Sequence, residues 1–326
     1  MDSRNPSFLS RSGTRAKCHS IIQHGSSTSS ENGNRRVTFE FFRYRFHFRA
    51  LEAVAFPPGK SANVLRGAFG TVLRESATPE EYVRLFRPGI SLGKSPSGLA
   101  DWPRPFIFRA AHLDGLSIAE GGPFFVDVHI FDLQRAVLPH FRSAFEQLAV
   151  HGVGHGRGRV ALERIERLDL EDRAEADAGD ASPPLSISLD AQGDAAHRVR
   201  IRFVTPTELK SEGKVAEQPE FPVLFGRLRD RISNLRALYG DGPYQLDYRG
   251  LSERAAGIVM KECQVEWARV KRRSGRTGQV HPLGGFTGDV AYEGELTEFL
   301  PWLRAGRWVG VGRQTVWGKG DMRVVS

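Results

Sequence analysis

The chain has 326 residues, about two domain lengths, which is long enough to bury a large core. Hydrophobic residues make up 40% of it and charged residues 26%, so a disordered, collagenous or fibrous chain is excluded. No stretch approaches the roughly 18 apolar residues that a membrane span needs. Its two cysteines, Cys18 and Cys263, are too few for a disulfide framework or a four-ligand zinc site. We therefore expect a globular cytoplasmic protein with no metal site, no cofactor and no membrane partner.

The charge of the chain is more informative than its composition. Lysine and arginine number 46 against 38 acidic residues, which gives a net charge of +8. Residues 162–194 hold three bases and ten acids, a net charge of −7, so the rest of the chain carries +15 (8 + 7). Such an excess favours a polyanionic partner, nucleic acid first and an anionic membrane second, although a soluble protein can be basic without either.

Residues 1–35 are rich in Ser, Arg, Gly and Asn and have almost no apolar periodicity. Such a segment cannot offset its own ordering entropy, so we predict a disordered basic tail. Its composition resembles a transit peptide and is equally compatible with an over-extended start or a flexible basic arm.

Two features recur at one offset along the chain. Apolar and polar residues alternate strictly over 42–50 and again over 198–203, about 157 residues later, and each pattern predicts a half-buried strand. Glycine-rich segments at 152–158 and 310–320 each precede another strand-like run, at an offset of 158 residues. The shared offset indicates a tandem duplication of one fold.

The second half shows which fold is repeated. Its predicted order is strand, helix, strand, strand, helix, strand, which is the ferredoxin-like unit. The helix with its apolar stripe at 223–238 ends at Gly240, and a short extra helix is predicted at 251–259 with Ser252 as its N-cap. The other elements are strands at 198–204, 264–271, 286–292 and 322–325 and a helix at 296–303.

The first half reads similarly, with a long irregular segment before residue 104. Its predicted elements are strands at 42–50, 106–109, 124–131 and 159–162 and helices at 61–75 and 137–148. We therefore predict an α+β protein with two tandem ferredoxin-like (RRM-like, βαββαβ) domains, a basic cleft between them and a C-terminal glycine-rich loop. The predicted domains span residues 36–165 and 195–326, joined by an acidic connector at 166–194.

Familiar nucleotide and metal motifs are absent from the sequence. The glycines at 152–156 lie before a strand rather than between a strand and a helix, and no complete P-loop is present. His151 and His155 are four residues apart, but the surrounding glycines do not support the helix that a metal-binding pair would need.

Two basic segments suggest contact with RNA. Lys271, Arg272, Arg273 and Arg276 follow Trp267, so a strand tip could grip phosphates beside a stacking face. The alternative for this segment is a solvated hairpin. On the first strand, basic residues occupy every second position and form either an RNA platform or a plain exposed face. They are Arg43, Arg45, His47 and Arg49.

Four further segments occur together in one order. The last segment runs from Gly310 to Gly320, between a predicted helix and the final predicted strand. It contains two Gly-x-Gly pairs that are separated by five residues. It is similar to the glycine-rich loop of the repeat-associated RNA-binding (RAMP) proteins of CRISPR systems. With the segments at 65–70, 205–210 and 281–288, the chain resembles the CRISPR-associated precursor-RNA-processing endoribonuclease family over residues 38–326.

The resemblance implies two ferredoxin-like domains and metal-independent cleavage of CRISPR repeat RNA. In that chemistry the ribose 2′-OH attacks the adjacent phosphate and leaves a 2′,3′-cyclic phosphate. The partner implied is CRISPR repeat RNA, or the crRNA made from it. Subunits of a CRISPR effector complex and a second copy of the chain are further candidates. The glycine-rich loop is expected either to contact RNA or to form a tight turn against the first strand. Its candidate RNA-binding residues are Gly310, Gly312, Arg313, Gly318, Lys319 and Gly320.

Cleavage needs a base, an acid and a cation for the phosphorane. Family members often carry the catalytic histidine on or just before the first helix, yet residues 56–75 contain none. Lys60 and Arg66 are the candidate cations, and His47 or His281 is the candidate base. Two alternatives stay open: a non-catalytic RNA-binding subunit of a CRISPR effector complex, and a basic regulator of duplex DNA.

Overall fold

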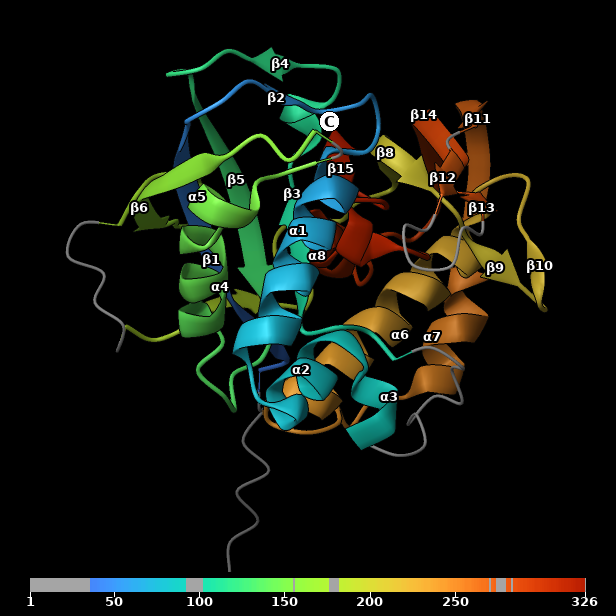
Figure 1. The fold of residues 1–326 in the computed structure, drawn as a ribbon. Helices are drawn as coiled ribbons and strands as arrows, with labels where there is room; N and C mark the ends of the chain where they lie inside the picture. Colours follow the sequence, from blue (N-terminus) through green and yellow to red (C-terminus); the bar gives the residue numbers. More distant parts are fainter. Residues whose placement is uncertain are drawn as a thin grey trace, which may run out of the picture. The chain divides into compact units, whose positions relative to one another are not determined.

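A five-stranded and a four-stranded antiparallel sheet carry the described part of the chain (Figure 1). The structure is a computed structural model that describes residues 36–91, 102–154, 156–175, 182–269, 271–273, 280–282 and 284–325. The predicted tail at 1–35 lies outside these residues, so it stays a prediction.

The first sheet has the strand order β3-β5-β1-β6. In chain order these are the second, third, first and fourth strands of one unit, which is the ferredoxin-like arrangement. The strands are β1 (Thr38–Ala50), β3 (Phe106–Arg109), β5 (Pro123–Ile130) and β6 (Val160–Arg167). Three shorter strands accompany them: β7 (Leu185–Ser188), which pairs with the start of β1, and β2 (Val54–Ala55), which pairs with β4 (Ser117–Ile118).

Helices cover one face of this sheet. In α1 the buried residues Leu65, Phe69 and Val72 recur at steps of three and four, and the ring of Phe69 stacks on that of Phe141 at 4.2 Å between centroids. Phe46, Phe48 and Ala50 of β1 point to the same core. The helices are α1 (Ser61–Ser76), α2 (Pro79–Phe86), α3 (Pro88–Ser91), α4 (Leu138–Glu146) and α5 (Leu148–His151), with a 3₁₀ turn η1 (Ala111–Leu113).

The second sheet repeats the same order as β11-β14-β8-β15. Its strands are β8 (Arg198–Thr207), β11 (Val259–Ala268), β14 (Gly285–Glu293) and β15 (Met322–Val325). Two hairpins extend from it, β9 (Lys210–Ser211) with β10 (Lys214–Val215) and β12 (Lys271–Arg273) with β13 (Val280–Pro282). The helices are α6 (Phe221–Tyr239), α7 (Tyr248–Ala255) and α8 (Leu300–Val309), and η2 (Thr315–Trp317) is a 3₁₀ turn. The predicted α+β fold class with two ferredoxin-like units is confirmed.

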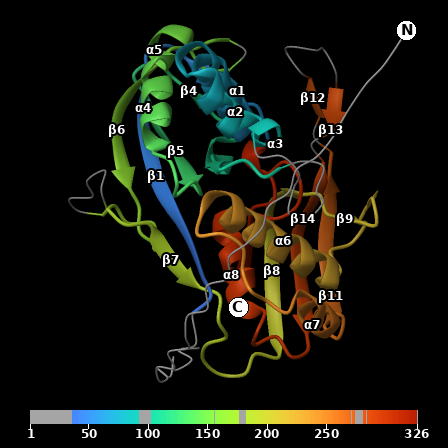
Figure 2. The same ribbon diagram turned by 90° about the horizontal axis from the view of Figure 1, so that it is seen from below.

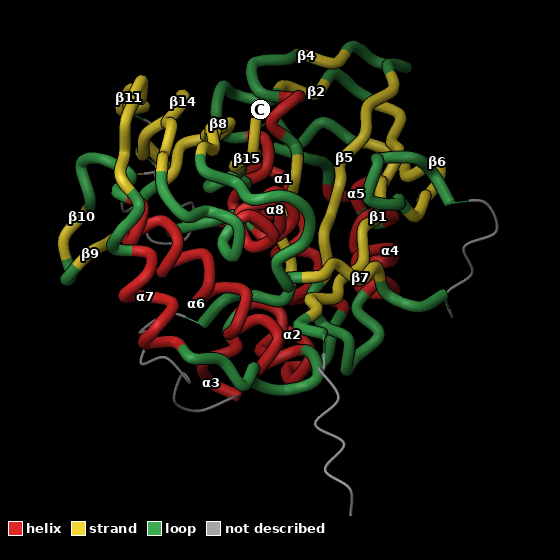
Figure 3. Tube along the Cα trace, turned by 180° about the vertical axis from the view of Figure 1, so that it is seen from behind, coloured by secondary structure: helices red, strands yellow, loops and turns green. Residues whose placement is uncertain are grey.

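Helix α8 lies between the two sheets, with β8 on one side and β1 on the other (Figures 2 and 3). It packs in the core of the second half, and that core also includes Phe39 and Phe41 of β1 and Ile107 of β3. The helix-free face of the first sheet is therefore partly covered by the second half. Residues 36–326 form one compact unit, and the predicted domain limits stay a prediction.

Several predicted boundaries were wrong for local reasons. Helix α7 begins after Asp247, whose Oδ1 accepts the N–H of Gly250 at 2.8 Å, so Ser252 is not its N-cap. Helix α2 lies in the segment predicted to be irregular, where Thr78 and Glu81 form a reciprocal capping box. Strand β11 starts five residues before the predicted start of the 264–271 strand. None of the helices in the described ranges is long and apolar enough to cross a membrane.

Candidate active site

The first turn of α1 is fixed by a side chain from another segment. Asp114 Oδ1 accepts the N–H of Ser61 at 2.9 Å and also the Ser61 hydroxyl. Lys60 is the N-cap residue and makes no capping hydrogen bond with its own side chain. Lys60 therefore stands at the positive end of a 16-residue helix, where anions are stabilised.

The glycine-rich loop at 310–320 docks on this turn. Lys319 is 3% exposed, and its Nζ donates to the carbonyl oxygen of Gly59 at 2.8 Å. Burial lowers the pKa of Lys319, the nearby Asp114 opposes that shift, and the charge of Lys60 adds to it. These electrostatic effects show that the three charged groups form one cluster at the start of α1.

Close backbone packing explains two of the loop glycines. A Cβ on Gly318 would lie 2.5 Å from the Cβ of Ala62, and one on Gly320 would lie 2.0 Å from the carbonyl oxygen of Val311. Both glycines have positive φ angles, 75° and 71°. The loop can therefore approach α1 and close on itself only with glycine at these positions.

Most amides of this loop already donate to protein oxygens. The N–H groups of Gly310, Gly318 and Gly320 donate to the carbonyls of Gly306, Thr315 and Pro206. This network favours the tight-turn interpretation of the loop, since an amide bonded within the protein is not offered to a phosphate. Contact of Gly310, Gly312, Gly318, Gly320 and Lys319 with RNA stays a prediction, and the burial of Lys319 favours a role in holding the loop.

Arg313 and Arg66 make different kinds of contact. The Arg313 side chain is 51% exposed and pairs with Glu208 at 2.5 Å. The Arg66 guanidinium lies over the rings of Phe86 and Trp317, at 4.8 and 5.7 Å from their centroids. Arg313 can therefore reach a polyanion from the loop, whereas the contacts of Arg66 favour packing of α1 against α2 and η2.

The basic residues of β1 are paired with acidic partners on the helix-free face of the first sheet. Nearest atoms lie 2.5 to 2.7 Å apart in three of these pairs. The pairs are Arg43 with Asp172, Arg45 with Asp127 (2.7 Å), His47 with Glu166 (2.7 Å) and Arg49 with Glu163 (2.5 Å). The outward arginines of β8 are paired in the same way. They are Arg198 and Arg200, both with Glu262, and Arg202 with Asp289. Neither strand presents an uncompensated row of positive charge.

A second histidine, which sequence reasoning missed, lies beside His47. The ring of His112 on η1 stacks on Phe125 at 4.2 Å between centroids, and the His47 ring lies 6.2 Å from the same phenyl ring. The guanidinium of Arg45 lies 4.1 Å from that ring centroid. His112 precedes Asp114 by two residues, so η1 links this face to the start of α1. Because the pairing depends on the register of β1 with β5, no local pattern around His112 indicates it.

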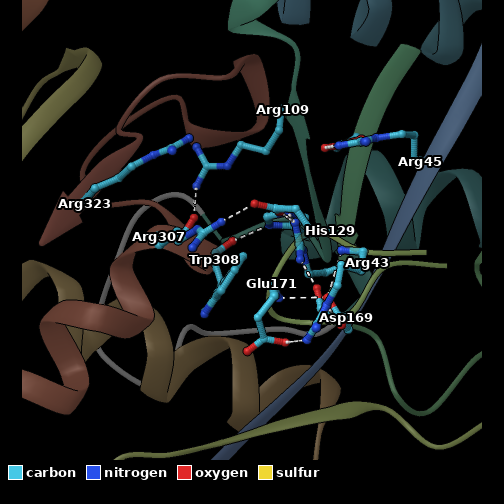
Figure 4. Close-up of polar contacts among 12 residues, drawn as sticks. Arg43, Arg45, Arg109, His129, Asp169, Glu171, Arg307, Trp308 and Arg323 are labelled. Atoms are coloured by element: carbon cyan, nitrogen blue, oxygen red, sulfur yellow. Dashed lines mark hydrogen bonds and ion pairs between the residues drawn. The ribbon is translucent and has the colours of Figure 1, made fainter. Parts of the chain in front are cut away.

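Donors from three elements cap the C-terminal end of α8, and Figure 4 shows two of them, Arg109 and His129. The last carbonyls of a helix have no partner within it, and positive groups are favoured there. The bonds run from Arg109 Nη2 to Arg307 O (2.9 Å), from His129 Nδ1 to Trp308 O (2.8 Å) and from Arg231 Nε to Val309 O (2.8 Å). The bonds from Arg109 and His129 join β3 and β5 to α8 and so hold the two halves together, while the bond from Arg231 joins α6 to α8 within the second half.

Burial and neighbouring positive charges lower the pKa values of His129 and Arg231. Burial lowers the pKa of His129 well below 6.5, and the charges of Arg109 and Arg43 lower it further. Burial, with the charge of Arg109, lowers the pKa of Arg231 to about 9. His129 is therefore neutral, with Nδ1–H donating to Trp308, as Figure 4 shows.

The remaining predicted residues lie on the β12–β13 hairpin. In the backbone register Arg272 faces His281, and Lys271 and Arg273 lie in the same strand. The side chains of these four residues, and Arg276 as a whole, lie outside the described residues. Within the described ranges, no group of three or more His, Cys, Asp or Glu side chains is placed to hold a metal ion.

Two family models match the chain. The model of the CRISPR-associated endoribonuclease Cas6 matches residues 201–322, and a second model, described as an N-terminal domain, matches residues 39–181. Among curated proteins, no sequence match reaches significance.

Solved Cas6 structures share the fold at low sequence identity. The product complex of the Thermus thermophilus Cas6 protein TTHB231 is 19% identical, covers 88% of this chain and 99% of that one, and has a TM-score of 0.57. The product complex of Cas6 TTHA0078 is 20% identical, covers 87% and 100%, and has a TM-score of 0.52. A partial Cas6-RT-Cas1–Cas2 complex is 14% identical, covers 89% and 47%, and has a TM-score of 0.53. The second half of the chain thus matches the Cas6 family model, and both halves together have the fold of solved Cas6 structures.

Proposed function

We propose that this protein cleaves CRISPR repeat RNA without a metal ion, by attack of a ribose 2′-OH on the adjacent phosphate. The observation that carries the proposal is the cluster at the start of α1, where Lys60, Asp114 and the docked Lys319 meet beside a face with two histidines. The cluster supplies a positive helix end and a lysine, and η1 connects it to the histidines on the helix-free face, so the groups that transesterification needs come from two neighbouring places in the first unit.

Two of the four predicted catalytic residues receive a role in this proposal. Lys60 stabilises the phosphorane, because it stands at the positive end of α1. His47 transfers a proton, with Glu166 orienting its ring at 2.7 Å. Arg66 and His281 are weaker candidates, since Arg66 packs between two rings and the His281 side chain lies outside the described residues.

RNA is the proposed partner, with the β12–β13 hairpin and Arg313 as its contacts. Two of the similar structures are Cas6 product complexes, and a third is a partial complex of Cas6-RT-Cas1 with Cas2. A non-catalytic RNA-holding subunit is the second candidate function. It is favoured by the lack of any histidine in residues 56–75, around the start of α1.

The experiment is to incubate the full chain with CRISPR repeat RNA in EDTA and to measure binding alongside cleavage. Our proposal predicts cutting at one position. Tight binding of RNA without cutting would favour the subunit role, and tighter binding to duplex DNA than to repeat RNA would favour a DNA regulator.

A further inference from the structure

The two histidines on the helix-free face of the first sheet lie in one small cluster around Phe125. His47 is the register partner of Phe125 across β1 and β5, and His112 stacks on the same ring from η1. The His112 residue is exposed, whereas the His47 side chain is 17% exposed. His112 and the Arg45 guanidinium cover the Phe125 ring, at 4.2 and 4.1 Å from its centroid, so a phosphodiester would meet the two imidazoles at the edge of this ring, beside the Arg45 guanidinium.

The hydrogen bond of His112 fixes which of its nitrogens carries the proton. Nε2 lies 3.0 Å from the carbonyl oxygen of Phe125, and a carbonyl can only accept, so Nε2 is the protonated nitrogen. The neutral ring then has its lone pair on Nδ1. Among the described residues, no hydrogen bond reaches that nitrogen. His112 is thus held by a bond and a stack in a form that can accept a proton.

His47 is held in a different electrostatic setting. A hydrogen bond from Arg164, together with one from His47, lowers the pKa of the Glu166 carboxyl, so Glu166 is ionised and accepts from His47 Nε2–H. With Nε2–H bonded to this carboxylate at 2.7 Å, Nδ1 is the ring nitrogen left to face a leaving oxygen. The two rings are thus held by different partners, a backbone carbonyl for His112 and a carboxylate for His47.

We infer that His112 is a second catalytic histidine, the general base of the cleavage, with His47 as the general acid; this inference rests on the proposed function. Nδ1 of His112 takes the proton of the 2′-OH while the 2′-oxygen forms its bond to phosphorus. The bond from phosphorus to the 5′-oxygen breaks, and that oxygen takes the Nδ1 proton of the His47 imidazolium. The products are a 2′,3′-cyclic phosphate and a 5′-OH, and proton exchange with water restores both rings.

The test uses glutamine variants that keep each anchoring donor. In His112→Gln the side-chain amide can still donate to the Phe125 carbonyl, and in His47→Gln it can still donate to Glu166, but neither transfers a proton. His197→Gln, at a side chain that is 63% exposed, is the control. We expect each of the first two variants to lower the single-turnover rate by about 10²–10⁴-fold, with RNA affinity and melting temperature unchanged.

A substrate with sulfur in place of the 5′-bridging oxygen separates the two roles, because a thiolate leaves without an acid. It should restore the rate of His47→Gln to within tenfold of wild type and leave His112→Gln slow. The inference would be overturned if the thio substrate restored the rate of His112→Gln, or if His112→Gln cleaved normal RNA at the wild-type rate. In either case, cleavage by the wild-type chain would still support the proposed function. Absence of cleavage by the wild-type chain would overturn both.

Discussion

The imidazole Nδ1 of His129 lies 2.8 Å from the carbonyl oxygen of Trp308, although 179 residues separate the two in the chain. His129 belongs to β5 of the first sheet and Trp308 to the last turn of α8. Arg43 Nε points at the other ring nitrogen at 3.4 Å, and its guanidinium lies 4.4 Å from the Trp308 ring centroid. This buried imidazole therefore links the two ferredoxin-like units at the end of a helix.

This link should make stability depend on pH. Above pH 6.5 His129 is neutral in both states. Below pH 6.5 the unfolded chain binds a proton that the folded chain, with its lowered pKa, does not, so the free energy of unfolding falls as the pH falls. The loss is about 1.4 kcal/mol at pH 5.5, one unit below the unfolded pKa.

The variant His129→Asn isolates this effect. Its amide can donate to the Trp308 carbonyl but cannot titrate. Chemical denaturation at pH 7.5 and 5.5 should show the stability advantage of wild type over the variant shrinking by about 1.4 kcal/mol at the lower pH. An advantage that stays constant between the two pH values would contradict the buried neutral imidazole.

Arg109 should be one of the costliest side chains to remove from the joint. Its Nη2 donates to the backbone carbonyl oxygen of Arg307, and its Nη1 lies 3.7 Å from Asp321 Oδ1. The Arg109 side chain is 12% exposed and the Asp321 side chain 8%. Arg109→Met leaves the buried Asp321 carboxylate with Arg323, 3.9 Å away, as its remaining ionic partner, so urea unfolding should show a loss of about 3 kcal/mol. Adding Asp321→Asn should recover part of that loss. Removal of an exposed pair member, Arg249→Ala, should cost less than about 0.5 kcal/mol; equal costs for the two arginines would refute the assignment.

Alanine at Gly318 should loosen the glycine-rich loop from α1. The added Cβ would lie 2.5 Å from that of Ala62, and φ is 75°, so both contact and conformation are strained. We expect Gly318→Ala to lower the melting temperature. Gly67→Ala is the matched control on α1, because nothing lies within 4 Å of its added Cβ, and it should raise stability by up to about 1 kcal/mol. A melting temperature for Gly318→Ala equal to or above that of wild type would contradict the docking.

Arg313 should act on RNA binding rather than on folding. Because its side chain is 51% exposed, Arg313→Ala should weaken binding to repeat RNA and make the dependence of log affinity on log salt shallower by about one unit. Lys319→Met should instead lower thermal stability, because Lys319 is buried on Gly59. Unchanged affinity and slope for Arg313→Ala would remove this residue from the RNA interface.

Local patterns were enough to predict the four main strands and the two main helices of each ferredoxin-like unit. The alternation over 42–50 became the central strand β1, and the apolar stripe at 223–238 became α6. Helix α2 was missed even though Thr78 and Glu81 form a capping box that is visible in the sequence. Its short length and the many prolines and glycines nearby hid it.

The ion pairing and burial of the charged residues depend on long-range packing, so they could not be predicted from local patterns. Arg202 looked like a free outward arginine, yet β14 places Asp289 opposite it in register. His129 lies within the strand predicted at 124–131, and no local pattern indicates that the end of α8 covers it. The pairing of His47 with His112 around one ring likewise depends on strand register and on the path of η1.

The most direct test of the account is the chemistry of the cut. Repeat RNA is incubated with the full chain in EDTA, and the ends of both products are identified by mass spectrometry. The account predicts a 2′,3′-cyclic phosphate and a 5′-OH at one position, and no cut when the single ribose before that position is 2′-deoxy. Products with a 5′-phosphate, or undiminished cleavage of the deoxy substrate, would contradict attack by the 2′-OH.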